Sequence, residues 1–148
     1  TISSLSAILL ASSALASSAL AADCESLWDF KIPNSDVHAA QTIPAGLYRA
    51  ADGSVHQNLP TFCGVAVAAH PTSDSDIEFE VWMPSSGWNG KFVGLGNGGF
   101  TGTIRYGQMA DMLKAGYATA NTNTGHWGSD GTLRTAARKK LSTSAIAP

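Results

Sequence analysis

The densest glycine cluster of the chain is the segment whose composition is best suited to ligand binding. It is the stretch Gly96-Asn-Gly-Gly-Phe-Thr-Gly102, directly after a short apolar run. Glycine permits positive φ and lets backbone N–H groups approach a ligand without an intervening Cβ. Two other interpretations stand beside ligand binding: a tight turn that only starts a helix, and a phosphate cradle. The phosphate cradle is the poorer one, because the spacing matches neither the dinucleotide nor the Walker pattern.

Carboxylates and tryptophans are the next candidates. Glu78 and Glu80 lie on one face of a predicted strand and resemble an acid pair. A solvated strand face explains them more simply, since glycosidase carboxylates face each other across a cleft. Trp82 and Trp88 could be platforms for a sugar or a phenolic ring, with core packing and loop anchoring as the simpler explanations.

The first 22 residues carry no charged side chain, and Leu5–Ala21 is rich in Leu, Ala and Ser. Small residues at Ala19 and Ala21 are those that signal peptidase requires, so residues 1–21 are predicted to be a secretory signal cleaved before Ala22. A transmembrane helix is the weaker alternative, because the stretch is short for a span of about 20 residues and contains several serines. Since the chain starts at Thr1 without a basic n-region, we expect it to be truncated at the front.

Secretion changes the interpretation of the two cysteines. In an oxidising compartment, Cys24 and Cys63 are expected to form a disulfide, which closes a loop of roughly 40 residues and stabilises the fold by about 3–4 kcal/mol. Metal binding is poorly supported, because the cysteines and histidines lack the close paired spacing of zinc sites. No N-x-Ser/Thr sequon occurs either. The histidines are His38, His56, His70 and His126.

The elements that position these residues begin with an antiparallel pair. Irregular cover with short strands around Ala45–Arg49 is predicted for Asp23–Leu59, where proline and glycine recur. Apolar and polar side chains alternate over Asp76–Met83, which indicates a half-buried strand. Its predicted antiparallel partner is Cys63–Ala69.

A strand-helix-strand unit follows. Lys91–Leu95 is predicted to be a short buried strand, Tyr106–Ala115 a helix stopped by Gly116, and Tyr117–Thr122 the next strand. This order predicts a right-handed βαβ crossover in a parallel sheet, and therefore an α/β fold. Ligand sites in such sheets lie beyond the carboxyl ends of strands, where the glycine cluster and Asn121–His126 would fall.

The overall composition excludes several classes of protein. Hydrophobic residues make up 44% and charged residues 14% of the 148 residues, which excludes a disordered chain and allows one compact domain at most. A formal charge of −2 excludes the strongly basic balance of a general nucleic-acid binder. The charge is unevenly distributed: Asp23–Leu133 carries five bases and eleven acids, whereas four basic residues follow from Arg134 to Lys140.

Five sequence blocks carry a family resemblance, which covers about Cys24 to Trp127. They are Pro60-Thr-Phe-Cys63, Ile77-Glu-Phe-Glu-Val-Trp-Met-Pro84, Trp88-Asn-Gly-Lys-Phe92, Gly96-Asn-Gly-Gly-Phe100, and Gly116-Tyr-Ala-Thr-Ala leading to Asn123-Thr-Gly-His126. In order and spacing they resemble the tannase and feruloyl esterase family. The resemblance implies a secreted α/β-hydrolase with a large inserted lid, which hydrolyses feruloyl or galloyl esters of plant polysaccharide or tannin by a serine mechanism.

The resemblance implies few catalytic residues here. The family's serine, aspartate and histidine motifs lie downstream of the matched segment, no Gly-x-Ser-x-Gly elbow occurs, and neither cysteine precedes a serine. One oxyanion-hole N–H is expected from the loop after the third strand of the hydrolase, with Gly98, Gly99 and Gly102 as candidates. His126 is expected to hydrogen-bond neighbouring loops behind the active site rather than to act as a base.

The expected organisation is a signal at 1–21, the N-terminal portion of the catalytic domain at 22–131, and a divergent tail at 132–148, with the resemblance ending near Trp127. The tail suggests a truncated or mis-spliced product, although a solvated or fraying helix over Thr132–Leu141 is an alternative.

The lid and the C-terminal half of the hydrolase would be absent. Any calcium site of the family would be absent with the lid, so no cofactor is expected. The predicted partner is an aromatic ester of plant origin, with no nucleic acid and no membrane. An inactive fragment is expected; the alternative is a secreted module that binds phenolic or glycan ligands without catalysis, through Trp82, Trp88 and Phe100.

Overall fold

The computed structural model describes residues 23–129 of the chain. The predicted signal at 1–21 and the predicted tail at 132–148 lie outside the described residues. In chain order, the elements are a 3-10 helix η1 at Cys24–Asp29, strands β1 at Ser35–Ile43, β2 at Gly46–Arg49, β3 at Val55–Leu59, β4 at Phe62–Ala69, β5 at Ile77–Pro84 and β6 at Phe92–Leu95, helix α1 at Tyr106–Lys114, and strand β7 at Ala118–Thr122.

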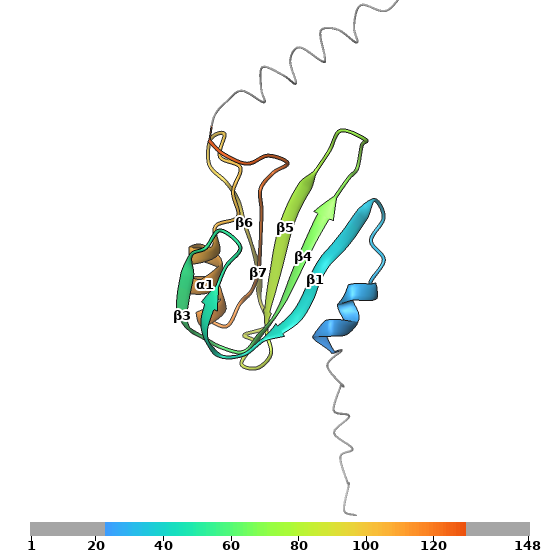
Figure 1. Cartoon of the computed structure of the whole chain (residues 1–148). Coiled ribbons are helices and arrows are strands. Elements are labelled where there is room, and N and C mark those ends of the chain that lie inside the picture. Colours follow the sequence, from blue (N-terminus) through green and yellow to red (C-terminus); the bar gives the residue numbers. More distant parts are fainter. Residues whose placement is uncertain (1–22, 130–148) are drawn as a thin grey trace, which may run out of the picture.

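A mixed sheet with the order β1-β4-β5-β7-β6 forms the body of the molecule (Figure 1). The first four strands in this order pair antiparallel, and β6 pairs parallel to β7. The antiparallel β4–β5 pair and the β6-α1-β7 unit confirm the predictions made from alternation and from the helix signals. Strands β2 and β3 form a separate hairpin.

Strand β1 corrects the prediction of irregular cover before Leu59. It pairs with β4 over its whole length, but the register shifts between Val37 and Ala39, as at a β-bulge. The extra residue breaks the alternation, so that Val37 and Ala40, three residues apart, both pack into the same cluster with Val65 and Val67. A search for a strict period of two therefore misses this strand.

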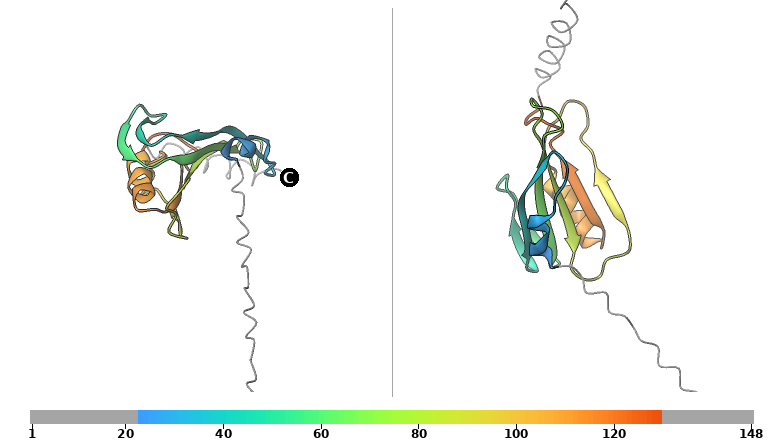
Figure 2. Two further views of the ribbon diagram at one scale, coloured as in Figure 1. Left: turned by 90° about the horizontal axis from the view of Figure 1, so that it is seen from below. Right: turned by 90° about the vertical axis from the view of Figure 1, so that its right-hand side faces the viewer.

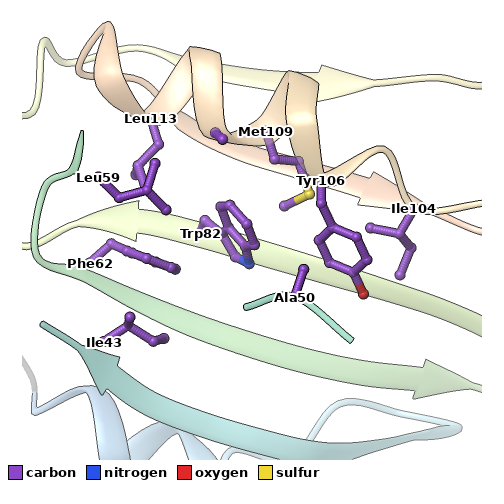
Figure 3. Close-up of a cluster of buried hydrophobic side chains, with 10 residues drawn as sticks. Ile43, Ala50, Leu59, Phe62, Trp82, Ile104, Tyr106, Met109 and Leu113 are labelled. Carbon is purple, nitrogen blue, oxygen red and sulfur yellow. The ribbon is translucent and has the colours of Figure 1, made fainter. Parts of the chain in front are cut away.

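The larger core lies between the sheet, the hairpin and α1 (Figure 3). Its centre is Trp82, which is fully buried, with the Phe62 ring centroid at 4.8 Å and the stacked Tyr106 ring at 5.9 Å. Met109 and Leu113 of α1 are also fully buried, as expected for an amphipathic helix that packs one face on a sheet. Thus α1 covers the sheet face that carries Trp82.

The opposite face carries the smaller cluster and is covered near β1 by η1. The left view in Figure 2 shows η1 and α1 toward opposite ends of the sheet. The expected disulfide joins Cys24 of η1 to Cys63 of β4, with a Cα–Cα distance of 5.5 Å. Glu25 adds a second attachment, because its Oε1 accepts a hydrogen bond of 2.7 Å from the backbone N–H of Thr42.

Candidate functional site

The candidate site lies where the chain leaves β6 and β7, whose parallel carboxyl ends meet at one edge of the sheet. The glycine loop, residues 96–105, follows β6, and the loop of residues 123–128 follows β7. The two loops join through a pair of backbone hydrogen bonds between Gly102 and Gly128, at 2.7 and 3.0 Å. Residues far apart in the sequence are thereby held at the edge where ligand sites of α/β sheets occur.

Gly102 is a packing glycine. It is buried, and a Cβ at this position would overlap the backbone carbonyl of His126 and lie 2.8 Å from that of Asn123. Its N–H already donates to the Gly128 carbonyl. Because a backbone N–H carries one hydrogen, Gly102 has none to offer a ligand. Of the three predicted oxyanion donors, only Gly98 and Gly99 remain as candidates.

Gly98 and Gly99 differ from Gly102 in their exposure and in the use of their N–H groups. Both are exposed, a Cβ on either would meet no atom within 4 Å, and neither N–H bonds to another described residue. Gly99 has φ 63°, the left-handed region that favours glycine. The Gly98 carbonyl accepts a hydrogen bond of 3.3 Å from the Thr101 N–H, which turns the loop back on itself. The N–H groups of these two glycines are therefore not used by a hydrogen bond within the described residues.

Three polar residues hold the glycine loop against the strand ends. Asn97 donates from Nδ2 to the Thr122 carbonyl at 2.7 Å and accepts from Arg105 Nε at 3.3 Å. Asn121, 2% exposed, accepts from the Arg105 backbone N–H at 3.1 Å and donates to the Leu95 carbonyl at 2.9 Å. Sequence reasoning missed this frame, although it had a signal: one asparagine lies two residues after the end of β6 and another lies near the end of β7.

Asn123 performs the same task for the second loop. It is 2% exposed, and its Oδ1 accepts hydrogen bonds from the backbone N–H groups of Glu78 at 3.0 Å and Gly125 at 2.9 Å. The side chain thus connects the loop after β7 to strand β5. A buried amide oxygen that accepts two backbone hydrogen bonds in this way fixes a local backbone conformation.

His126 links the two loops. Its Nε2 lies 2.9 Å from the Phe100 carbonyl oxygen. A carbonyl only accepts, so Nε2 must carry the proton. This contact agrees with the expectation that His126 hydrogen-bonds neighbouring loops, and it leaves Nε2 unable to act as a base while the contact is formed.

The aromatic platform interpretation is wrong for Trp82, which is a core residue with no exposed surface. Trp88 is 59% exposed and anchors its loop by donating from Nε1 to the Lys91 carbonyl at 2.9 Å. Phe100 is 53% exposed at the tip of the glycine loop. Only Trp88 and Phe100 therefore offer open aromatic surface among the three predicted platforms.

A solvated strand face is also wrong for the Glu80 side of β5, because that face carries the main core. Glu80 Oε2 accepts from Trp82 Nε1 at 2.9 Å, and Oε1 accepts from the Tyr106 hydroxyl at 2.7 Å. Burial, and then the hydrogen bond to Glu80, raise the pKa of Tyr106 well above its ordinary value. Glu78 is half-buried, and its Oε1 accepts from Trp127 Nε1 at 3.3 Å.

The described residues supply no activated nucleophile. Both cysteines are in the disulfide. Ser54 contacts His56 Nε2 at 2.9 Å, but its hydroxyl donates its single proton to Asp52 at 2.6 Å. His56 therefore donates to Ser54 rather than accepting its proton, which is the reverse of a catalytic serine–histidine pair.

Residues 23–129 contain no group of three or more histidine, cysteine or acidic side chains that could hold a metal ion. No helix in the same range is long and apolar enough to cross a membrane.

A sheet that is antiparallel at one end, a parallel βαβ unit at the other and a glycine loop at the carboxyl end of β6 define the class: the N-terminal part of an α/β-hydrolase. Residues 63–145 match the family described as tannase and feruloyl esterase, and the chain belongs to that family. The matched range includes most of 132–148, which corrects the expectation that the resemblance ends near Trp127. The boundaries predicted at 21/22 and 131/132 stay predictions.

Individual relatives agree with this assignment. The chain is 41% identical over 117 residues to an uncharacterized esterase of Xanthomonas campestris pv. campestris, covering 79% of this chain and 20% of that protein. It is 33% identical over 124 residues to a probable feruloyl esterase B-1 of Aspergillus oryzae, covering 77% of this chain and 23% of the relative.

Solved structures show the same fold. The crystal structure of feruloyl esterase B from Aspergillus oryzae superimposes with a TM-score of 0.66 at 37% identity, over 73% of this chain and 22% of that one. The chain thus spans between a fifth and a quarter of the length of these relatives.

Proposed function

We propose that this chain is part of a secreted carboxylic ester hydrolase that cleaves aromatic-acid esters, of the feruloyl or galloyl type, by a serine mechanism. Its contribution is a backbone donor for the oxyanion. One observation carries the proposal: Gly98 and Gly99 are exposed, and their N–H groups donate to no described residue. Both glycines lie in the loop after β6, which is the position where an α/β-hydrolase has its oxyanion loop. Family membership and the names of the relatives support the ester substrate.

The chemistry follows from the charge that develops during ester cleavage. Attack on the ester carbonyl places a negative charge on its oxygen, and a preorganised N–H aimed at that oxygen lowers the barrier by about 3–4 kcal/mol. The frame of Asn97, Arg105 and Asn121 keeps the loop backbone in place, so the donor does not need to reorganise during the reaction. The nucleophile, its base and the second donor come from outside the described residues.

The extracellular location rests on two supports. The Cys24–Cys63 disulfide is typical of an oxidising compartment, and residues 1–21 have the composition of a secretory signal. A plant cell-wall polysaccharide or a tannin is the corresponding extracellular substrate. The choice between feruloyl and galloyl esters depends on parts of the enzyme that form the acyl pocket.

A chimeric enzyme tests the proposal. Residues 23–129 would replace the matching segment of the Aspergillus oryzae feruloyl esterase B, and hydrolysis of methyl ferulate and methyl gallate would be measured with and without a serine-directed inhibitor. Gly98→Pro removes the amide hydrogen, whereas Gly98→Ala keeps it and its Cβ meets no atom within 4 Å. We expect Gly98→Pro to reduce kcat by about 10²–10³-fold and Gly98→Ala to leave it within about threefold.

Proline cannot adopt the φ of 63° at Gly99, so proline tests only the Gly98 amide. A folded chimera that hydrolyses neither ester would overturn the proposed activity. An active chimera in which Gly98→Pro lowers kcat no more than Gly98→Ala does would overturn the role of the Gly98 amide.

A further inference from the structure

Two adjoining hollows lie on the sheet face that carries Trp82. Their volumes are about 200 and 370 Å³. Ala51, Ala66 and Glu80 line both hollows, so the two are parts of one groove. We call it the sheet groove.

The floor of the sheet groove is made of small residues on neighbouring strands. Ala39 of β1 lies opposite Ala66 of β4, and Ala66 lies opposite Glu80 of β5. Gly64 continues the floor, and a Cβ there would lie 2.7 Å from Ile43 Cδ1. Small side chains leave the sheet backbone open between taller neighbours, which is how a flat sheet face becomes hollowed.

Aromatic side chains form the walls. Tyr48, on the β2–β3 hairpin, lines the smaller hollow, and Tyr106 and Trp127 line the larger one. Trp127 is 54% exposed, which leaves part of its surface open to a ligand. It follows His126, whose contact with Phe100 ties this loop to the glycine loop. The groove therefore ends beside the loop that we propose binds the oxyanion.

The polar groups of the groove are held in place and mostly accept hydrogen bonds. Trp82 Nε1 and the Tyr106 hydroxyl each occupy one oxygen of Glu80, and each carboxylate oxygen retains a further acceptor site. Burial and the charge of Glu80 raise the pKa of Tyr48 to about 12, so its hydroxyl stays protonated and can both donate and accept. That hydroxyl bonds to no other described residue.

The charge of the lining selects the ligand. Glu78 and Glu80 are acidic, His38 at the bulge of β1 is the basic group, and no lysine or arginine lines either hollow. Such a surface repels anions, including a free aromatic acid, and suits a ligand that presents hydroxyl donors to carboxylates. Sugars combine such hydroxyls with an apolar ring face that stacks on tryptophan or tyrosine.

We propose that the sheet groove binds the neutral sugar chain that carries the ester, with Glu80 and Tyr48 contacting hydroxyls and Trp127 stacking on a ring. Naming the sugar as part of the substrate rests on the proposed esterase function. The groove would hold the polysaccharide while the ester reaches the glycine loop.

The test measures binding directly on the full 148-residue chain, without any ester. Backbone amide NMR signals would be followed during titration with a neutral xylo-oligosaccharide, with ferulate as an anion and with spermidine as a cation. We expect the oligosaccharide to shift the signals of Ala51, Ala66 and Trp127, and ferulate to leave them unchanged.

Two variants locate the site. Ala66→Leu fills the floor where the two hollows meet, and Glu80→Gln removes the charged acceptor; each should weaken sugar binding by at least about fivefold. Ala115→Leu, an exposed position at the end of α1 outside the groove, adds the same bulk and should have no effect. If Glu80→Gln unfolds the chain by releasing Trp82 and Tyr106, Ala66→Leu still decides.

The proposal is overturned if the oligosaccharide moves no groove signals, if Ala66→Leu binds it as well as the Ala115→Leu control does, or if only spermidine binds. Because no ester is cleaved in this experiment, its result is separate from that of the chimera. If the chain binds sugar but the chimera is inactive, the proposed sugar site stands and the proposed esterase function is rejected. If the chimera is active but the chain binds no sugar, the esterase function stands and the sugar site is rejected.

Discussion

Trp82 and Trp88 lie close together in the sequence but in opposite surroundings. Trp82 has no exposed surface and contacts Phe62, Tyr48 and Tyr106, whereas Trp88 is 59% exposed. Alternation along β5 assigned Trp82 to the polar side of the strand. The assignment failed because both faces of this strand are covered, one by α1 and the hairpin and the other by the smaller cluster.

Replacing these two tryptophans should therefore have unequal effects. Trp82→Ala leaves a large cavity in the core and should lower the free energy of unfolding by about 3–5 kcal/mol. Trp88→Ala loses one surface hydrogen bond and should cost about 1 kcal/mol or less. Urea denaturation followed by far-UV circular dichroism measures both; equal losses for the two variants would contradict the arrangement of the core.

Glu25 should produce a pH dependence at the attachment of η1. Its hydrogen bond from the Thr42 N–H lowers the pKa of the carboxyl from 4.5 to about 2. Since the folded pKa lies below the unfolded one, the stabilisation is complete above pH 4.5 and is lost as the pH falls toward 2. Asp23 opposes this, because its hydrogen bond with Glu25 raises the pKa of Asp23.

The Thr42 amide signal in NMR spectra reports this bond. It should titrate with a midpoint near pH 2, and Glu25→Gln should abolish the titration. Asp29→Asn, in the same 3-10 helix, is the control and should leave the midpoint unchanged. A midpoint near 4.5 in the unmodified chain would show that the bond does not form in solution.

At the scale of elements, the disulfide fastens η1 to the sheet. Cys24 and Cys63 are separated by 39 residues, a span that includes β1 and the β2–β3 hairpin. In the chain-entropy estimate, a loop of this length stabilises the folded state by about 3–4 kcal/mol. Its contribution is large for a chain of this size.

The double variant Cys24→Ala/Cys63→Ala should lower the free energy of unfolding by about 3–4 kcal/mol. Hydrogen exchange at Thr42 should accelerate more than at Leu113, because Thr42 depends on η1 whereas Leu113 is in the main core. The unmodified chain under reducing conditions should match the double variant. Uniform acceleration at both amides would show that η1 is not a separate unit.

Local patterns were sufficient for some elements and insufficient for others. The β4–β5 pair is a clean alternation with a turn-rich connection, and β6-α1-β7 has distinct start and stop residues, so both were predicted correctly. Strand β1 was missed because of its bulge. Strand β3, Val55–Leu59, was missed because it is a polar strand stabilised by β2 and by α1 rather than by its own periodicity.

For the whole molecule, the described residues place no nucleophile beside a base. We expect the purified chain alone to hydrolyse neither methyl ferulate nor methyl gallate, because its cysteines are bonded to each other and the Ser54 proton goes to Asp52. Release of the free acid would be followed by chromatography, with the Aspergillus oryzae feruloyl esterase B as the positive control. Turnover by the chain that a serine-directed inhibitor abolishes would contradict this expectation.

The family, the α/β class, the disulfide pairing and the position of the glycine loop can all be derived from the amino-acid sequence, because each depends on residues in a short window or on the spacing of matched blocks. The tertiary structure alone showed that the Gly102 amide is used by Gly128, that Trp82 is core, and that small residues of two strands open the sheet groove. These properties depend on partners distant in the sequence. Whether a backbone N–H is hydrogen-bonded, and whether an alanine lies in the core or lines a groove, depends on the residues that the fold places next to it.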